Sequence, residues 1–356
     1  MYLLFYYFRL TSPQIAGITK YAENSNIMKT LVTGGCGFIG SHTVDRLLAE
    51  GHDVIVIDNL SSGSIRNLEH HKGNSKLQVH LAGIEDHAKI EGYFAGIDWV
   101  FHLAALADIV PSIEKPMQYH NSNVNGTISV LEACRKHQVK RVIYAASSSC
   151  YGIPDSFPTP ESAEIRCQYP YAVTKYLGEE YALYWEQIYK MNITCMRFFN
   201  VYGTRARTSG TYGAVFGVFL AQKLNNKSYT VVGDGKQTRD FTYVTDIVDA
   251  CVTAVKRDDV SGEIFNVGSG NTYSINRLVQ LLGGEITYIP KRPGEPDCTF
   301  ADTSKINKTL NWKPKVSLEE GVKIMLENID YWREAPLWDT QSIAEATKDW
   351  FKYLGK

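Results

Sequence analysis

MKTLVTGGCGFIGSHTVDRLLAEGHDVIVIDN occupies residues 28–59 and decides the fold. Its first apolar run, residues 29–33, predicts a buried strand, and a glycine turn then leads into a helix over residues 38–50. A second strand is expected at residues 53–57, and it ends at Asp58. Strand, glycine-rich turn, helix and strand in this order predict a unit that binds a dinucleotide.

The glycines of this turn have the spacing that a dinucleotide requires. Gly34, Gly37 and Gly40 form G-x-x-G-x-x-G: one makes the tight turn, one lets the backbone approach the pyrophosphate, and one lets the helix pack on the strand. The free N–H groups of the helix N-terminus then face the phosphates. Asp58 would accept hydrogen bonds from both hydroxyls of the adenosine ribose and would repel a 2′-phosphate, so the unit predicts NAD rather than NADP.

Composition limits the partners and the compartment. The chain has 356 residues, 44% of them hydrophobic and 21% charged, and a net charge of −1 without a basic tract. Neither nucleic acid nor an anionic membrane surface is therefore an expected partner. Seven scattered cysteines without a C-x-x-C pattern predict reduced thiols in the cytoplasm, with no disulfide framework and no metal site.

Residues 1–27 lie outside the pattern that begins at Met28. MYLLFYYFRL is apolar, but it is too short to span a bilayer and has neither a positive n-region nor a small-residue cleavage site. We expect residues 1–27 to be an extension outside the fold, with Met28 as an alternative start. No transmembrane segment is expected elsewhere.

Strands and helices alternate along the next part of the chain. Further strands are expected at residues 77–80, 98–103, 141–146 and 192–199, and helices at 85–94, 117–137 and 169–190. This alternation predicts an α/β fold, a Rossmann-type doubly wound parallel sheet whose ligands bind at the carboxyl ends of the strands. Residues 28–200 would mainly form the NAD-binding domain and residues 201–356 a smaller α/β substrate domain, the two interleaving. His102, inside one strand, is expected to be a packed core histidine.

A tyrosine and a lysine form the main catalytic candidate. Tyr171 and Lys175 are four residues apart on the predicted helix 169–190, so their side chains share one face. An ammonium beside a phenol favours the phenolate, and it should lower the pKa of Tyr171 toward neutrality. The preceding strand ends at Ser147, Ser148 and Ser149. A chance pair on a helix surface is the alternative.

Two arginines are candidates for binding a diphosphate. Arg239 and Arg292 follow glycine-rich or proline-rich turns, and a guanidinium offers forked donors to phosphate oxygens. Solvated surface arginine is the alternative for each. The last predicted helices, residues 318–332 and 342–353, are expected to serve only structural closure.

Taken together, these segments resemble the extended short-chain dehydrogenase/reductase superfamily, and within it the NAD-dependent nucleotide-sugar epimerases and dehydratases. TGGCGFIGSH is similar to the family's cofactor turn, YAVTK to its tyrosine–lysine pair, and RFFNVYG and GDGKQTRDFTYV to its substrate-side segments. The resemblance covers residues 28–332. It implies an NAD domain, a smaller domain that binds a nucleoside-diphosphate sugar, and a homodimer formed through the helices 117–137 and 169–190.

The resemblance also implies a transient oxidation at C4 of the sugar. Tyr171 takes the proton of the 4-hydroxyl while hydride passes from C4 to NAD, Lys175 holds the nicotinamide ribose, and Ser147 hydrogen-bonds the same sugar oxygen. The 4-keto sugar turns over and hydride returns to its other face. The implied cofactor contacts are Gly34, Gly37, Phe38, Ile39, Gly40, Asp58, Asn59, Ala104, Ala105, Asn123, Tyr171, Lys175 and Phe198. The implied substrate contacts are Ser148, Ser149, Asn200, Arg239, Arg292 and Thr299.

The residues after Ser147 favour one branch of the superfamily. The 4,6-dehydratases carry an Asp-Glu pair where this chain has Ser148-Ser149, and glucuronate decarboxylases usually carry Glu at the position of Ser149. The run AASSS-x-YG resembles UDP-N-acetylhexosamine epimerases, and Thr299 is smaller than the tyrosine of epimerases restricted to galactose and glucose. The resemblance is therefore closest to UDP-N-acetylglucosamine 4-epimerases of surface polysaccharide biosynthesis.

Other functions stay open at this point. UDP-glucose or UDP-glucuronate 4-epimerase and UDP-glucuronate decarboxylase keep the same chemistry, since Ser148, Ser149 and Thr211 could supply hydroxyls to an acidic sugar. A 4,6-dehydratase and a non-catalytic NAD sensor are further alternatives; most such sensors lack the tyrosine or the lysine, and this chain has both.

Overall fold

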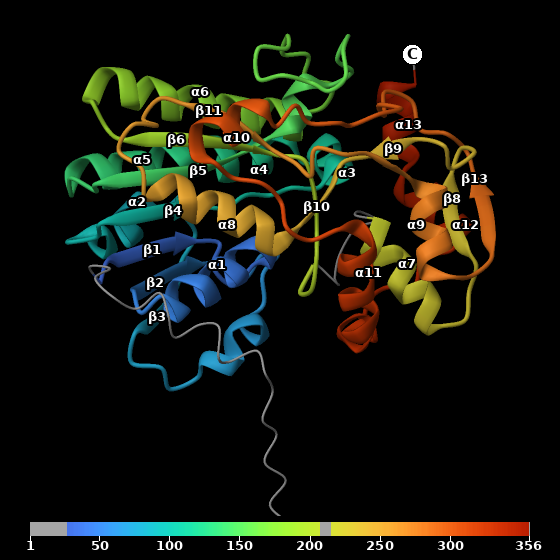
Figure 1. Cartoon of the computed structure of the whole chain (residues 1–356), viewed down its shortest axis with the longest axis horizontal. Coiled ribbons are helices and arrows are strands. Elements are labelled where there is room, and N and C mark those ends of the chain that lie inside the picture. The colour runs from blue at the N-terminus through green and yellow to red at the C-terminus, as the bar shows by residue number, and fades with distance from the viewer. Residues whose placement is uncertain (1–26, 207–214, 356) are drawn as a thin grey trace, which may run out of the picture.

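The computed structural model describes residues 27–206 and 215–355 (Figure 1). Its centre is a seven-stranded sheet with the order β11-β6-β5-β4-β1-β2-β3, and every neighbouring pair is parallel. Parallel strands of this order, linked by helices, confirm the predicted doubly wound fold. The strands are β1 (Lys29–Thr33), β2 (Asp53–Asp58), β3 (Leu77–Leu81), β4 (Trp99–His102), β5 (Arg141–Ser147), β6 (Ile193–Phe198) and β11 (Ile264–Val267).

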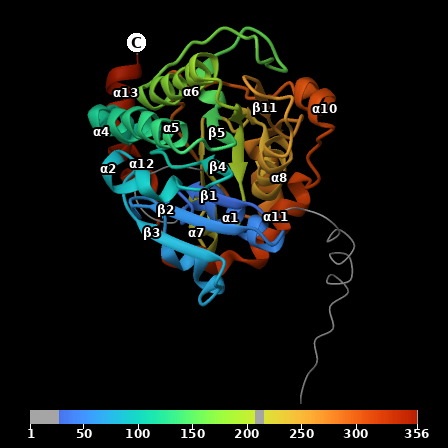
Figure 2. The ribbon, with the colours of Figure 1, turned by 90° about the vertical axis from the view of Figure 1, so that its left-hand side faces the viewer.

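Both faces of the sheet are covered because its strands are apolar on both sides. In β1, Leu31 belongs to one buried cluster and Val32 to the other, as the two-residue period of a strand requires. One cluster is shared with α1 (Phe38–Ala49) and α8 (Val244–Val255), the other with α5 (Gly126–Lys136) and α6 (Pro170–Tyr189). Figure 2 shows the sheet between α5 and α6 on one side and α8 on the other.

Two of the helices predicted within residues 28–200 are interrupted. Residues 117–137 form α4 (Pro116–His120), a π-helical turn (Asn121–Asn125) and α5 rather than one regular helix. Residues 85–94 form only α2 (His87–Ile90) and a 3₁₀ turn (Glu91–Phe94). Apolar spacing does not distinguish these closely related helix types, because their side chains cover similar faces.

A second lobe lies beside the carboxyl edge of the sheet, on the right in Figure 1. Its core contains Phe216, Leu278 and Trp332, all fully or almost fully buried. From this lobe the chain returns to the main sheet, because β11 pairs with β6. The lobe's main elements are α7 (Val215–Leu224), β8 (Tyr229–Val232), α9 (Ile275–Leu282), β13 (Ile286–Ile289), α11 (Leu318–Glu327), α12 (Thr340–Ala346) and α13 (Lys348–Leu354).

Shorter elements join the lobe to the sheet. They are β7 (Asn200–Tyr202), which pairs with β10 (Phe241–Tyr243), β9 (Thr238–Arg239), which pairs with β12 (Tyr273–Ser274), and α10 (Ser304–Leu310).

A buried ion pair fastens α6 to the sheet. The Arg197 guanidinium on β6 donates two hydrogen bonds to the Glu179 carboxylate on α6, at 2.5 and 2.9 Å, and both side chains are almost fully buried. Arg197 also donates to the Tyr151 hydroxyl at 2.8 Å. A forked pair of this kind fixes orientation as well as distance, so the helix that carries Tyr171 and Lys175 has a defined position on the sheet.

Within the described residues, no helix has both the length and the apolar composition that crossing a membrane requires.

Candidate active site

A cavity of about 640 Å³ lies where the carboxyl edge of the sheet meets the second lobe. Parallel strands all end at this edge, so segments that are far apart in the sequence meet there. Every predicted site residue except Asn123 lines the cavity. From the cofactor set these are Gly34, Gly37, Phe38, Ile39, Gly40, Asp58, Asn59, Ala104, Ala105, Tyr171, Lys175 and Phe198, and the others are Ser147, Ser148, Ser149, Asn200, Arg239, Arg292 and Thr299.

The glycine turn is packed so closely that side chains have no room. A Cβ atom on Gly40 would lie 2.0 Å from the Gly34 carbonyl oxygen, and one on Gly34 would lie 2.8 Å from the backbone of Ala104. Gly34 also has a φ of +72°, in the left-handed region. Gly37 caps α1 without a side-chain hydrogen bond. The turn therefore presents bare backbone at a helix N-terminus, which fits the pyrophosphate of NAD.

Asp58 ends β2 on the wall of the same cavity. Its carboxylate accepts hydrogen bonds from the backbone N–H of Cys36 at 2.9 Å and of Leu60 at 2.8 Å. Burial raises the pKa of Asp58, and these two N–H donors oppose the rise. The carboxylate is thus held in place across the turn, where it can also accept from ribose hydroxyls.

Tyr171 and Ser147 meet at the end of β5, and Lys175 lines the same cavity. The Tyr171 hydroxyl donates to Ser147 Oγ at 3.4 Å, and Ser147 Oγ lies 2.9 Å from Ser149 Oγ. Lys175 is 5% exposed, and its Nζ lies 4.4 Å from the centre of the Tyr144 ring. The tyrosine–lysine pair is therefore not a chance surface pair.

The predicted lowering of the Tyr171 pKa by Lys175 is wrong. Burial raises the pKa of Tyr171, and the hydrogen bond to Ser147 only partly opposes this rise. Burial also lowers the pKa of Lys175 to about 8, against the attraction of Glu179. The Lys175 ammonium is held over the ring of Tyr144, so it does not dominate the ionisation of Tyr171.

His102 is a core residue, as the sequence predicts. It is 1% exposed, and its ring nitrogens lie 2.7 Å from Thr33 Oγ1 and 3.0 Å from Thr127 Oγ1. Burial lowers the pKa of His102 to about 3, so the ring is neutral at physiological pH.

Asn123, which the family resemblance places among the cofactor contacts, does not line the cavity. Its side chain accepts from the N–H of Leu106 at 2.8 Å and donates to the carbonyl of Leu106 at 2.9 Å and to Thr174 Oγ1 at 3.0 Å. Leu106 lines the cavity and Asn123 does not. Asn123 therefore braces the cavity wall from behind, because its polar atoms bind this backbone segment.

The two arginines face the cavity and one carboxylate. Arg239 donates to Glu295 Oε1 at 2.7 Å, and Arg292 Nη1 lies 3.8 Å from Glu295 Oε2. Their side chains are only 10% and 12% exposed, so the solvated-surface alternative is wrong for both. Asn200 accepts a hydrogen bond from Thr299 Oγ1 at 2.6 Å on the same wall. Two guanidinium groups at one end of the cavity can bind an anionic diphosphate.

Sequence reasoning missed several aromatic residues of the cavity, among them Tyr169 and Trp350. Tyr169 lies two residues before Tyr171, and Trp350 belongs to α13 near the other end of the chain. The expectation that the last helices serve only structural closure is therefore wrong for α13. No spacing pattern connects Trp350 with the other site residues, because only the docking of α13 brings it there. Thr211, named above as a hydroxyl donor, lies outside the described residues.

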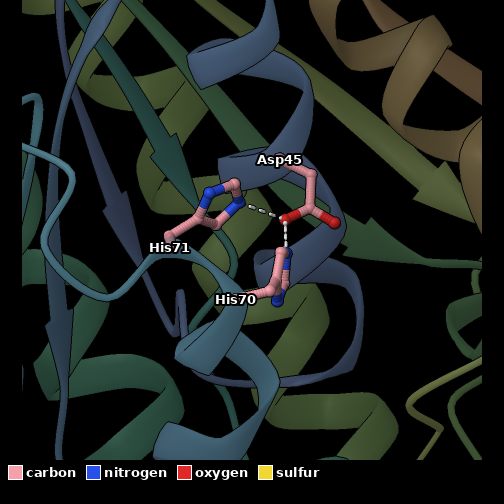
Figure 3. Close-up of side chains that lie close together, drawn as sticks. All are labelled: Asp45, His70 and His71. Carbon is pink, nitrogen blue, oxygen red and sulfur yellow. Dashed lines mark hydrogen bonds and ion pairs between the residues drawn. The ribbon is translucent and has the colours of Figure 1, made fainter. Parts of the chain in front are cut away.

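A cluster outside the cavity has side chains of the kinds that bind metals, but they are already hydrogen-bonded and ion-paired with one another. His70 and His71 both donate through Nε2 to one oxygen of Asp45, at 2.8 and 2.7 Å (Figure 3). Arg205 pairs with the other oxygen of this carboxylate at 2.5 Å. A guanidinium on the same carboxylate opposes the binding of a further cation, and the cluster fastens the 3₁₀ turn Ile65–His71 to α1.

The chain is similar to known proteins over most of its length. Residues 30–268 match the model of the "NAD dependent epimerase/dehydratase family". A UDP-glucose 4-epimerase of Mycolicibacterium smegmatis is 36% identical over 309 residues, which are 84% of this chain and 98% of that protein. Two solved structures are similar over most of both chains. One is a UDP-N-acetylglucosamine 4-epimerase of Methanobrevibacter ruminantium M1 in complex with UDP-N-acetylmuramic acid, with 34% identity and a TM-score of 0.79 over 85% of this chain and 100% of that chain. The other is a UDP-glucuronic acid 4-epimerase of Bacillus cereus in complex with UDP-glucuronic acid and NAD, with 32% identity and a TM-score of 0.78 over 86% of this chain and 99% of that chain.

Proposed function

The chain belongs to the NAD-dependent epimerase/dehydratase family, and from that premise we propose that it is a UDP-sugar 4-epimerase that interconverts UDP-N-acetylglucosamine and UDP-N-acetylgalactosamine. Its cofactor is NAD, which fits the glycine turn and Asp58. The observation that carries the proposal is that Tyr171, Ser147 and Lys175 line one cavity together with this turn and two arginines.

Each group has a role that its position supports. Bound NAD would supply the hydride acceptor and donor that the transient oxidation at C4 of the sugar requires. Tyr171 would take and return the proton of the 4-hydroxyl as the phenolate, a form that a bound, positively charged nicotinamide ring would favour, and Ser147 would hydrogen-bond the same oxygen. Lys175 holds the nicotinamide ribose. Arg239 and Arg292 bind the diphosphate, which lets the hexose turn over without leaving the site.

The choice of sugar rests on the small residues of the cavity. Ser148, Ser149 and Thr299 all line it, and none of them is an acid that could protonate or deprotonate C5 or C6. Serines rather than an acid pair at positions 148 and 149 support an epimerase over a 4,6-dehydratase. Thr299 leaves room beside Asn200 for an N-acetyl group. We place the reaction in surface polysaccharide biosynthesis.

A second candidate keeps the mechanism and changes the sugar. A similar structure, the B. cereus enzyme, is a UDP-glucuronic acid 4-epimerase, and serine hydroxyls can also bind a C6 carboxylate. UDP-glucose is the third substrate to consider, because it is the substrate of the M. smegmatis relative.

One assay tests the reaction and the substrate together. The purified protein is incubated separately with UDP-N-acetylglucosamine, UDP-glucose and UDP-glucuronate without added NAD, and products are followed by NMR. We expect the first substrate to give its C4 epimer. Epimerisation of only another sugar would replace the substrate assignment. Release of carbon dioxide from UDP-glucuronate would instead assign a decarboxylase, and no change in any sample would contradict the epimerase.

We further propose that residues 28–200 mainly bind NAD, that residues 201–356 mainly bind the UDP-sugar, and that the enzyme is a cytoplasmic homodimer. Exposed apolar side chains on α4 and α6 support the dimer: Met117 is 79% exposed, Tyr184 56% and Ile188 50%. Apolar residues gathered on neighbouring helices are typical of a surface that a second copy covers.

The dimer is tested with a charge on this surface. Ile188→Glu should convert the dimer to a monomer in light scattering at micromolar concentration, because a buried unpaired carboxylate costs several kcal/mol. Tyr288→Glu is the matched control, since Tyr288 is 57% exposed on β13 in the other lobe. A wild-type monomer, or an unchanged mass for Ile188→Glu, would refute this interface.

A further inference from the structure

The helix α13 connects the two sides of the cavity. The preceding helix α12 begins with a capping box between Asp339 and Ser342 and buries Ile343 in the core of the second lobe. From there α13 reaches α3 (Ile109–Glu114), which follows β4 on the NAD side, and the two helices are in contact. Figure 1 shows α13 at the C-terminus, between α12 and α3. The helix thus lies across the boundary of the two lobes.

Trp350 is the residue of α13 that enters the cavity wall. It is 4% exposed, and its indole Nε1 donates to the Pro293 carbonyl at 2.7 Å. The Arg292 guanidinium carbon lies 5.4 Å from the centre of its ring. The indole is therefore fixed against the segment that carries one of the diphosphate arginines.

A row of aromatic rings links Trp350 to the reacting centre. The Tyr169 ring lies 6.5 Å from Trp350 and 6.4 Å from Tyr171, and the rings of Tyr169 and Tyr171 are nearly parallel, at 6°. The row ends at the proposed catalytic tyrosine on one side and at Arg292 on the other. In the proposed reaction the hexose C4 would lie beside Tyr171 and the diphosphate beside Arg292, so this row of rings would run beside the hexose.

We propose that Trp350 is a substrate-positioning residue that walls the hexose part of the cavity and retains the sugar while its C4 is oxidised. This inference rests on the proposed function. A pyranose ring has faces lined with C–H groups, which pack on aromatic rings, and a buried indole excludes water from the site. Its contact with Arg292 also restricts the guanidinium before substrate binds.

Retention matters because the reaction passes through an oxidised sugar. Oxidation moves a hydride from C4 to NAD and the hydroxyl proton to Tyr171. If the 4-keto sugar leaves before the hydride returns, the two electrons remain on the cofactor and the enzyme stays reduced. A weaker wall therefore has a signature beyond slower turnover, namely reduced nicotinamide in the enzyme and 4-keto sugar in solution.

The test compares Trp350→Ala, Trp350→Phe and the control Tyr353→Ala, which removes a 53% exposed ring from the same helix. Calorimetry measures the Kd of each holoenzyme for UDP-N-acetylglucosamine, UDP-glucose, UDP-glucuronate and UDP, and absorbance follows reduced nicotinamide during turnover. We expect Trp350→Ala to raise the Kd for the UDP-sugar that the enzyme binds about tenfold, to raise that for UDP much less, and to accumulate reduced nicotinamide. Trp350→Phe should restore most of the affinity for the UDP-sugar and should accumulate little reduced nicotinamide. Tyr353→Ala should match the wild type in both measurements.

Three outcomes would overturn the proposal. One is a Trp350→Ala variant with wild-type binding and no reduced nicotinamide. Another is an equal rise of Kd for UDP and UDP-sugar, which would limit Trp350 to holding Arg292. The third is a Trp350→Phe variant that folds as the wild type does and binds UDP-sugar no better than Trp350→Ala. If the wild type epimerises none of the three sugars, the proposed function fails, whereas the difference in Kd between UDP-sugar and UDP still tests the wall.

Discussion

The two sides of the cavity are built in different ways. On the cofactor side, Gly34, Gly40 and Asp58 belong to one βαβ unit, and hydrogen bonds within that unit hold them. On the side that we propose to bind substrate, Arg239, Arg292 and Trp350 come from three separate segments, and Glu295 and Pro293 hold them together. A local backbone motif is visible as residue spacing, whereas a wall assembled from distant segments is not.

Tyr171→Phe should separate chemistry from cofactor binding, with the largest effect. Loss of the hydroxyl removes the proton acceptor, so kcat should fall about 10³-fold while NAD stays bound. Turnover and the nicotinamide content of the purified protein measure the two effects. Tyr184→Phe, on the exposed side of the same helix, is the control. A fully active Tyr171→Phe would contradict the mechanism.

Gly40→Ala should damage the cofactor side alone. The new Cβ would lie 2.0 Å from the Gly34 carbonyl oxygen, so the turn must shift, at a cost of about 3 kcal/mol. We expect protein purified without NAD and with a lowered melting temperature that still binds UDP. Gly92→Ala is the control, because no atom lies within 4 Å of its added Cβ. Retention of NAD by Gly40→Ala would show that this close packing is dispensable.

Lys175 lies between the two sides, and its burial has a cost that depends on pH. The pKa of Lys175 is lowered from 10.5 to about 8. Below pH 8 the lysine is charged in both states, and the folded protein bears the burial cost. Between pH 8 and 10.5 only the unfolded chain keeps the proton, so stability from this group rises with pH.

Lys175→Met should therefore stabilise the nucleotide-free protein by about 2–3 kcal/mol below pH 8, and this advantage should fade as the pH rises to 10.5. Urea unfolding of both proteins across this range measures it. The exposed Lys227 provides the control, since Lys227→Met removes a solvated charge. A difference in free energy of unfolding that does not change with pH would refute the assignment.

Thr299→Tyr should change only the substrate side, with the smallest effect. A tyrosine ring beside Asn200 should reduce kcat/KM for UDP-N-acetylglucosamine about tenfold and leave kcat/KM for UDP-glucose nearly unchanged. Thr299→Ser keeps the hydroxyl that donates to Asn200 and should behave as the wild type. Equal losses for both sugars would mean that Thr299 supports the wall without selecting the substrate.

Packing decided the features that the sequence did not predict correctly. The long helix 117–137 contains a π turn in which Asn123 bonds to Leu106, and Asn123 therefore supports the cavity without lining it. The pKa of Tyr171 was expected to fall because Lys175 is one turn away. It rises instead, since burial dominates and the ammonium lies over Tyr144.

The sequence by itself determined the parallel sheet, the glycine turn, Asp58 and the Tyr171–Lys175 pair, because each depends on local spacing and hydrophobic period. Only the tertiary structure decided that Glu295 would bridge Arg239 and Arg292 and that Trp350 would wall the cavity. Such contacts join segments through packing and charge after the chain has folded, and no period in the sequence records which segments will meet.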